Sequence, residues 1–298
     1  MKEYRSKLAK KEAIEGYLYA LPWFIGFTVF TAGPIIASFI LSFTNWDLIK
    51  SPQWIGFGNY KALTEDPLFW QGLKVTSIYA TFSVPLGIAG GLAIAVLMNQ
   101  RIKGLSIFRT IYYLPAVVSG VAVSLLWSWI FNPDFGVLNY LLSLIRIKGP
   151  GWIYDEKWAL PSLIIMSLWG VGGGMVIYLA SLQGVPTELY EAAIIDGASS
   201  WKRFWSITIP MISPVIFFQL IMGIIGSFQV FTQAYIMTNG GPNNATLFYV
   251  LYLYRNAFQW FKMGYASALA WVLFLVILIL TIVQFKIANY WVYYEVGR

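Results

Sequence analysis

The sequence contains no cysteine and no histidine among its 298 residues. Without cysteine the chain forms no disulfide and offers no thiolate, and without histidine it lacks the commonest general base and metal ligand. These two absences argue against zinc and haem sites and against most acid–base enzymes. We therefore expect no metal and no cofactor held by the chain.

Charged residues are also scarce, at 11%, whereas a soluble protein has about 25%. Hydrophobic residues make up 58% of the chain, and the mean hydropathy is +0.66. A water-soluble domain of this length would not bury so much apolar surface, so the solvent is predicted to be membrane lipid. The net charge of +7 is also typical of nucleic-acid binding. Here, however, the basic residues are spread over the loops between apolar stretches, and we expect no nucleic-acid partner.

Six apolar stretches are each long enough to cross a hydrocarbon core, which takes about 20 helical residues. They predict an all-α integral membrane protein with a transmembrane domain at 17–285, preceded by a segment 1–16 and followed by a tail 286–298. A basic start before an apolar run also resembles a signal peptide, but the first stretch is too long and no small-residue cleavage site ends it. The spans are predicted at about 17–43, 73–97, 109–131, 159–182, 211–236 and 263–285.

An even number of spans places both termini on one side, and the distribution of lysine and arginine indicates which side is cytoplasmic. The predicted inner segments hold twelve basic residues and the outer segments eight, and five of the twelve precede the first span. Because inner loops are enriched in basic residues, the N-terminus and the C-terminus are predicted to be cytoplasmic. The outer segments 45–72, 132–158 and 237–262 are rich in Trp, Tyr, Pro and Gly. This composition fits an interfacial aromatic belt, with a docking surface for an extracytoplasmic partner as the alternative.

Two further absences concern energy. No predicted span has an Asp or Glu in its interior, which argues against the intramembrane carboxylate relays of proton-driven transporters. The chain also has no Gly-x-x-x-x-Gly-Lys-Ser/Thr phosphate loop. If ATP drives this protein, a separate polypeptide must bind the nucleotide.

A polar interruption between the fourth and fifth spans carries the clearest local pattern. A helix is predicted at 187–196, with Glu188 and Glu191 in its first turn, where the helix dipole favours carboxylates. Gly197 follows at the position of a left-handed C-terminal cap. Either Ser199 or the next serine is suited to cap a second short helix. Two short helices joined by a tight bend would fit a cleft on a partner, although an ordinary surface loop has similar features.

The spacing within this hairpin resembles the cytoplasmic signature of binding-protein-dependent ABC importer permeases. Glu191-Ala192-Ala193 is followed after three residues by Gly197, and after nine more by Ile207-Thr-Ile209-Pro210. The family pattern ends in Ile-x-Leu-Pro, so Ile209 replaces the usual leucine with similar apolar volume. With the Thr-Asn-Gly-Gly-Pro turn at 238–242 and the overall length, the chain resembles the maltose-type sugar permeases over nearly its whole length.

The resemblance implies a multi-pass protein of a prokaryotic cell (inner or plasma) membrane. Its implied partners are a second homologous permease subunit, a cytoplasmic ATP-binding subunit dimer, an extracytoplasmic solute-binding protein, a sugar and membrane lipid. In such permeases the Glu-Ala-Ala helix, here 187–197, docks on the ATPase and transmits its closure to the spans. The matching coupling residues are Glu191, Ala192, Ala193, Asp196 and Gly197.

The resemblance also places substrate contacts at mid-membrane positions of the fourth and fifth spans. Gly170 and Gly173 belong to a glycine-rich run that favours either close helix packing or a local break. Polar side chains among aromatic rings in the fifth span suit either helix–helix hydrogen bonds or a sugar. The matching pathway positions are Trp169, Gly170, Gly173, Gly223, Ser227, Phe228 and Val230, with Gln229 nearby.

Other functions remain as alternatives. An importer of glycerol phosphate or another small polar solute would require cations facing the cavity, and only Lys74 and Arg109 lie at span edges. An integral membrane enzyme would need a catalytic carboxylate, for which Asp134 and Asp155 are isolated candidates. A structural scaffold is the third alternative, against which the coupling signature argues. We expect a transport protein that is not itself an enzyme.

Overall fold

The computed structural model describes residues 7–100 and 103–294, with side chains from residue 9 onward. Part of the basic segment 1–16, Arg101 in the first inner loop and the end of the tail 286–298 therefore lie outside the described residues. The chain divides into two compact units. One contains the residues up to Glu65 together with Arg255–Val272, and the other contains Asp66–Tyr254 and the residues from Leu273 onward.

Helices dominate both units, as the sequence predicts. The first unit contains α1 (Lys7–Phe27), α2 (Gly33–Leu41), α3 (Gly58–Glu65), the short strands β1 (Thr44–Asn45) and β2 (Gln53–Trp54), and the beginning of α14 (Met263–Ala288). The second unit contains α4 (Pro67–Met98), α5 (Leu105–Val117), α6 (Gly120–Ile130), α7 (Val137–Leu144), α8 (Ala159–Ser167), α9 (Gly172–Gln183), α10 (Thr187–Ile195), α11 (Ser200–Arg203), α12 (Ile209–Phe228), α13 (Tyr249–Tyr254) and the rest of α14.

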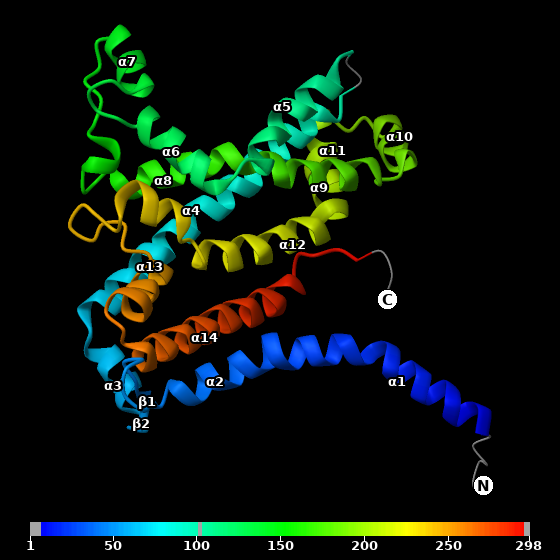
Figure 1. The fold of residues 1–298 in the computed structure, drawn as a ribbon. Helices are drawn as coiled ribbons and strands as arrows, with labels where there is room; N and C mark the ends of the chain where they lie inside the picture. The colour runs from blue at the N-terminus through cyan, green and yellow to red at the C-terminus, as the bar shows by residue number, and fades with distance from the viewer. Residues whose placement is uncertain (1–6, 101–102, 295–298) are drawn as a thin grey trace. The chain divides into compact units, whose positions relative to one another are not determined.

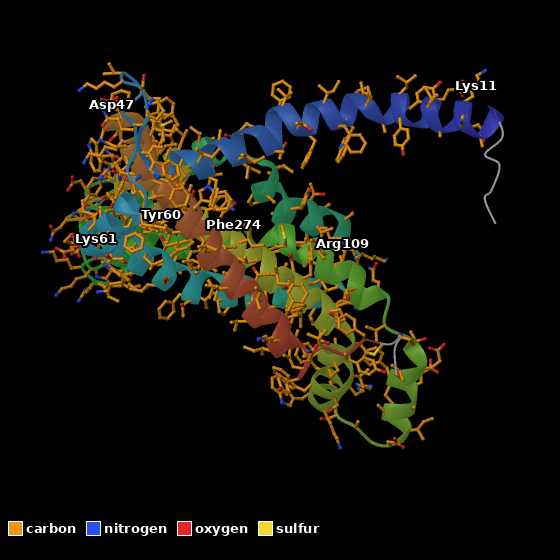
Figure 2. The ribbon with its side chains drawn as sticks, turned by 90° about the horizontal axis from the view of Figure 1, so that it is seen from below. Lys11, Asp47, Tyr60, Lys61, Arg109 and Phe274 are labelled. Carbon is orange, nitrogen blue, oxygen red and sulfur yellow. The ribbon has the colours of Figure 1, made fainter. Side chains whose placement is uncertain are left out.

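The first unit is organised around a small loop structure after α2. Strands β1 and β2 pair antiparallel, with Thr44 opposite Trp54. The buried Asn59 donates its amide to the carbonyl oxygens of Ser42 and Thr44, at 2.8 and 2.9 Å, which ties α3 to the end of α2. Figure 2 labels Asp47 and Tyr60 of this loop structure. The Asp47 carboxylate accepts a backbone hydrogen bond from Lys50, the main cause that lowers the pKa of this carboxyl group.

Within the described residues, five helical segments are long and apolar enough to cross a membrane, and a sixth crossing results if the bent pair α5 and α6 counts as one. These segments confirm the all-α membrane prediction. The helices extend beyond several predicted ends. In particular, α4 begins at Pro67, where the Asp66 side chain caps it by accepting from the backbone N–H of Leu68 at 2.9 Å.

The third span is not the single straight helix expected at 109–131. Helices α5 and α6 meet at an angle of 100°. Pro115 lacks the N–H needed for the helical hydrogen bond, and Val118 has extended backbone torsions, so α5 ends two residues after the proline. Ser119 and Gly120 then begin a new helix, and a Ser/Gly pair is a common site of sharp kinks.

The fifth span also differs from the expectation. The second helix of the hairpin is not a separate short helix, because Ser200–Phe228 runs as one helical segment of 29 residues. A π-helical turn at Phe204–Thr208 precedes Pro210, and the wide turn accommodates a proline ring that would otherwise clash with the carbonyl four residues earlier. At the other end, α12 stops at Phe228, and a separate π-helical turn follows at Ala234–Thr238, so 211–236 is interrupted.

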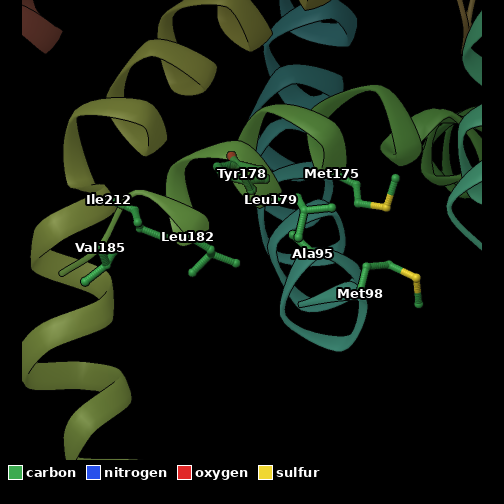
Figure 3. Packing of buried hydrophobic residues seen from close by; sticks show 8 residues of the cluster. All are labelled: Ala95, Met98, Met175, Tyr178, Leu179, Leu182, Val185 and Ile212. Carbon is green, nitrogen blue, oxygen red and sulfur yellow. The ribbon is translucent and has the colours of Figure 1, made fainter. Parts of the chain in front are cut away.

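The core of the second unit lies where α4 packs against α9 and α12 (Figure 1). Glycine allows a very close approach of α9 to α5, because a Cβ atom on Gly172 would lie 1.8 Å from the carbonyl oxygen of Tyr112 on α5. Eight buried residues, half of them on α9 and the others on α4, on α12 or just beyond the end of α9, form an apolar cluster (Figure 3). They are Ala95, Met98, Met175, Tyr178, Leu179, Leu182, Val185 and Ile212.

Candidate functional site: a coupling hairpin and an intramembrane cavity

The hairpin at 187–203 has the local structure that its sequence predicts. Helix α10 ends at Ile195, and Gly197 adopts the left-handed conformation with φ +72°. Ala198 donates its backbone N–H to the carbonyl of Ala193 at 2.8 Å, which satisfies an orphan carbonyl at the helix end. Ser199 caps α11 by accepting from the backbone N–H of Lys202 at 3.3 Å. The predicted turn and the predicted serine cap are therefore confirmed.

The tip of the hairpin presents apolar side chains together with the signature residues. Glu191, Ala192, Asp196 and Gly197 are exposed, and Ala193 is half-buried. Ile195 is 86% exposed at the end of α10. Ile194, Trp201 and Trp205 are also exposed. Sequence reasoning did not single out these apolar residues, although the Ile194-Ile195 pair within a polar interruption was a visible signal.

The base of the hairpin is attached to the core of the second unit. The hydroxyl of Tyr190 on α10 lies 2.9 Å from Oγ1 of Thr208, in the π-helical turn that leads into α12. Tyr190 and Ile207 also pack against the apolar cluster. Helix α10 is therefore linked to the residues that lead into α12 by one hydrogen bond and by apolar contacts.

A cavity of about 470 Å³ lies among α4, α8, α9 and α12. None of its lining residues is Asp, Glu, Lys or Arg, and its polar side chains carry hydroxyls and amides. The hydroxyl of Tyr79 interacts with the side chains of Ser83, Ser167 and Gln233. The lining residues are Tyr79, Ser83, Val84, Gly87, Ile88, Ser167, Gly170, Val171, Gly174, Tyr178, Gln219, Met222, Gly223, Gly226, Ser227, Val230 and Gln233.

Four of the expected pathway positions line this cavity, namely Gly170, Gly223, Ser227 and Val230. The other four lie elsewhere. The Trp169 ring packs edge-on against that of Trp127, with centroids 5.6 Å apart. A Cβ on Gly173 would contact the Ala116 side chain at 3.5 Å. Phe228 is buried, and Gln229 is an exposed residue at the end of α12.

The glycine-rich run of the fourth span shows both features that the sequence left open as alternatives, namely a local break and close helix packing. A 3₁₀ turn at Leu168–Val171 separates α8 from α9. Gly170 lies in this turn and lines the cavity, and a Cβ added to it would meet no atom within 4 Å. Gly172 instead permits the close packing of α9 against α5. The run therefore combines a local break with a tight helix contact.

Sequence reasoning missed the contribution of α4 to the cavity. Tyr79 and Ser83 come from the second span, which no motif marks. Tyr178 is another missed residue, with a buried hydroxyl that has no hydrogen-bond partner among the described residues. Gln219 comes from the middle of α12.

The carboxylates considered for an enzyme do not form a catalytic group. Asp155 accepts backbone hydrogen bonds from Lys157 and Trp158, at 2.8 and 3.3 Å, which is the geometry of a local turn before α8. Asp134 is exposed. Among residues 7–100 and 103–294 no group of three or more Asp or Glu side chains is arranged to hold a metal ion.

Comparisons with protein families, with single relatives and with solved structures all match this chain to permeases of binding-protein-dependent ABC transporters. Residues 83–290 match the family described as "Binding-protein-dependent transport system inner membrane component". The probable ABC transporter permease protein YesP of Bacillus subtilis is 44% identical, covering 98% of this chain and 96% of its own length. The lactose transport system permease protein LacF of Rhizobium radiobacter is 38% identical, covering 96% and 97%. A chain of a bacterial alginate ABC transporter, solved with an alginate pentasaccharide-bound periplasmic protein, superposes with a TM-score of 0.83 at 25% identity, covering 95% and 97%.

Proposed function

Because the chain belongs to the family of binding-protein-dependent transport system inner membrane components, we propose that it is the permease subunit of an ABC importer for a neutral sugar or oligosaccharide. The family is a transport component of the inner membrane rather than an enzyme, so the chain is a multi-pass membrane protein that makes and breaks no covalent bond. ATP is bound by a partner subunit, and a solute-binding protein presents the substrate.

The observation that carries the substrate proposal is the uncharged lining of the cavity. Its hydroxyls and amides, from Tyr79, Ser227, Gln219 and Gln233 among others, suit the many hydroxyl groups of a sugar. The aromatic rings of Tyr79 and Tyr178 offer apolar surface to the C–H faces of a pyranose ring. The relatives whose names specify lactose or alginate support a carbohydrate.

The same lining weighs against the alternative substrate. A phosphate ester would be expected to bind to lysine or arginine, because charge-assisted hydrogen bonds are the strong ones for phosphate. The cavity has no such residue. Import of glycerol phosphate is therefore the weaker candidate. It would require a second permease subunit to supply the cationic side chains that bind the phosphate.

The proposed mechanism is alternating access. A binding protein delivers the sugar to the outer face, ATP closes a dimer of ATPase subunits, and the hairpin at 187–203 moves with them. Glu191, Ala192, Ala193, Asp196 and Gly197 are the proposed coupling residues, and the exposed Ile195 adds an apolar anchor. The Tyr190–Thr208 contact then transmits the displacement to α12, which lines the cavity. A second homologous permease would complete the pathway.

ATP-dependent uptake in proteoliposomes tests this function. The vesicles hold this chain, a sister permease, the ATPase and the binding protein, and they are offered neutral oligosaccharides or glycerol phosphate. We expect uptake of the neutral sugar only. Ile195→Ser should abolish both uptake and ATPase retention while the permease still folds, because the substituted side chain is already exposed.

Ile49→Ser is the matched control, since Ile49 is 88% exposed but lies in a predicted outer segment. It should leave uptake and ATPase retention unchanged. Full ATPase binding and uptake by the Ile195→Ser protein would refute the docking role of the hairpin. Uptake of glycerol phosphate in place of sugar would refute the substrate assignment alone.

A further inference from the structure

Helix α7 (Val137–Leu144) and the residues that flank it expose an unusual amount of apolar surface for a segment outside the predicted spans. The helix lies at the opposite end of its unit from the coupling helix α10 (Figure 1). Seven large apolar side chains here are each more than half exposed, namely Phe135, Val137, Tyr140, Leu141, Leu144, Ile145 and Ile147. In water, such a surface would be unfavourable on a short connecting helix.

The helix is held with its polar side inward. The Asn139 amide nitrogen donates to the carbonyl oxygens of Pro133 and Pro150, at 3.0 and 3.3 Å. The indole N–H of the buried Trp152 donates to the Asn139 side-chain oxygen at 2.6 Å. A Cβ on Gly149 would lie 1.8 Å from that same oxygen, so the chain passes very close to the amide. This network fixes the rotation of α7 and directs the apolar residues outward.

The orientation is the reverse of that of a helix packed on a soluble protein. Val137, Leu141 and Leu144 recur at spacings of three and four residues and therefore share one face. That face points away from the protein, whereas the asparagine points into it. A helix arranged in this way matches apolar surroundings on its outer side.

The charges beside this face identify the surroundings. Arg146 and Lys148 follow the helix directly, are exposed, and have no acidic residue between positions 135 and 154 to neutralise them. Tyr140 and Tyr154 are also exposed. Apolar side chains flanked by aromatic rings and cations are the composition of a segment that lies at the membrane interface, where the cations meet lipid phosphates.

We propose that the segment 135–148 is a lipid-binding surface. In this arrangement α7 lies at the membrane–water interface on the extracytoplasmic side, and Arg146 and Lys148 bind the phosphates of anionic lipid. The proposal is independent of the sugar assigned to the cavity and of the hairpin. It assigns a function to an outer segment for which the sequence left open an aromatic belt or a docking surface for a protein partner.

The absence of cysteine from the chain allows a direct test. Leu144→Cys provides a single attachment site for a nitroxide in the assembled transporter, reconstituted in nanodiscs of phosphatidylcholine with or without phosphatidylglycerol. Oxygen, which concentrates in hydrocarbon, and a water-soluble nickel chelate then report the surroundings of the label. Asp134→Cys is the water reference, and Ile279→Cys, an exposed apolar position on α14, is the lipid reference.

We expect the Leu144 label to be reached by oxygen and shielded from nickel, as at Ile279. Arg146→Gln and Lys148→Gln should each lower the preference for anionic over zwitterionic lipid by about fivefold, measured with spin-labelled lipids. Nickel access equal to that at Asp134 would place α7 in water and overturn the proposal. Shielding from both probes would show that a protein partner covers α7, which also overturns it. An unchanged lipid preference in the two glutamine variants would remove the assigned phosphate contacts.

Discussion

Two glycines two residues apart in the fourth span have opposite surroundings. A Cβ at Gly172 would overlap the backbone carbonyl of Tyr112, which has no flexible end to move, whereas a Cβ at Gly170 meets nothing within 4 Å. Only position 172 therefore requires glycine for packing. Gly170 instead lies in the 3₁₀ turn beside the cavity, where added volume would narrow the cavity rather than disturb the fold.

The first prediction compares alanine at these two positions. Gly172→Ala should lower the free energy of unfolding by about 1–3 kcal/mol, because the extra methyl group forces α9 away from α5. Gly170→Ala should change it by less than about 0.5 kcal/mol. Thermal unfolding of both purified variants in detergent measures the difference. Equal stability of the two proteins would contradict the close approach of α9 and α5.

Two glutamine residues of the second unit allow a similar comparison for sugar uptake. Gln233 lines the cavity and interacts with Tyr79, whereas Gln284 is a buried amide on α14 that is not among the lining residues. Gln233→Leu should lower kcat/KM for sugar uptake by about tenfold, as expected when one buried hydrogen bond of roughly 1–2 kcal/mol is lost.

Gln284→Leu is the control, with kcat/KM expected to stay within about twofold because the replaced amide does not contact the cavity. Its side-chain oxygen is buried and lacks a partner among the described residues, so leucine should be tolerated. Kinetics of uptake, with the amount of each permease in the membrane held equal, provide the measurement. A large loss in the control and none in Gln233→Leu would show that the cavity does not bind the sugar.

At the scale of the element, the hairpin shows what a local sequence encodes. The left-handed Gly197 and the Ser199 cap depend only on neighbouring residues, and both were predicted correctly. The continuous helix from Ser200 to Phe228 was not predicted, because Pro210 ordinarily marks a helix start and the π-helical turn that accommodates it has no reliable sequence pattern. The 100° bend after Pro115 was missed for a related reason, since proline in a membrane span often produces only a kink.

The Tyr190–Thr208 hydrogen bond provides the prediction for the hairpin. Tyr190→Phe keeps the ring packed on the apolar cluster and removes only the hydroxyl, so the protein should fold and still bind the ATPase. Uptake should fall several-fold relative to ATP hydrolysis, because α10 can move without displacing α12.

A double-mutant cycle with Thr208→Val separates this contact from other effects. We expect a coupling energy of about 0.5–1.5 kcal/mol in the uptake rate, the net contribution of one hydrogen bond. The measured quantity is sugar transported per ATP hydrolysed. Additive effects of the two substitutions would mean that the hydroxyls do not act together and that packing alone transmits the movement.

At the scale of the whole molecule, the composition was sufficient to predict a membrane protein, and the hairpin motif was sufficient to predict the family. Neither of them could predict which residues line the cavity. Half of the expected pathway positions line it, one from the fourth predicted span and three from the fifth. Tyr79 and Ser83 were missed since the packing of α4 against α9 and α12 is a long-range contact with no local signature. The apolar tip at Ile195 was passed over because an exposed isoleucine is common in any protein.

The number of membrane crossings remains the central prediction about the molecule, and the bent pair α5–α6 decides it. If the pair crosses once, four crossings separate Lys11 from Ser199, and both residues lie on the same side of the membrane. If the pair returns to the side from which it entered, three crossings separate them, and they lie on opposite sides. The proposed function requires the first arrangement, since the hairpin must meet a cytoplasmic ATPase.

Single cysteines in the cysteine-free chain distinguish the two arrangements. Lys11→Cys, Ser199→Cys and Lys50→Cys all replace exposed side chains, and a membrane-impermeant maleimide is applied to intact cells and to inverted vesicles. We expect Lys50→Cys to react in cells and the other two only in inverted vesicles. Reaction of Ser199→Cys from outside while Lys11→Cys reacts only from inside would make α5–α6 a re-entrant pair. The odd number of crossings would then place the hairpin on the side away from ATP. The basic N-terminus would still mark the cytoplasmic side, but the signature could not be kept as a guide to orientation.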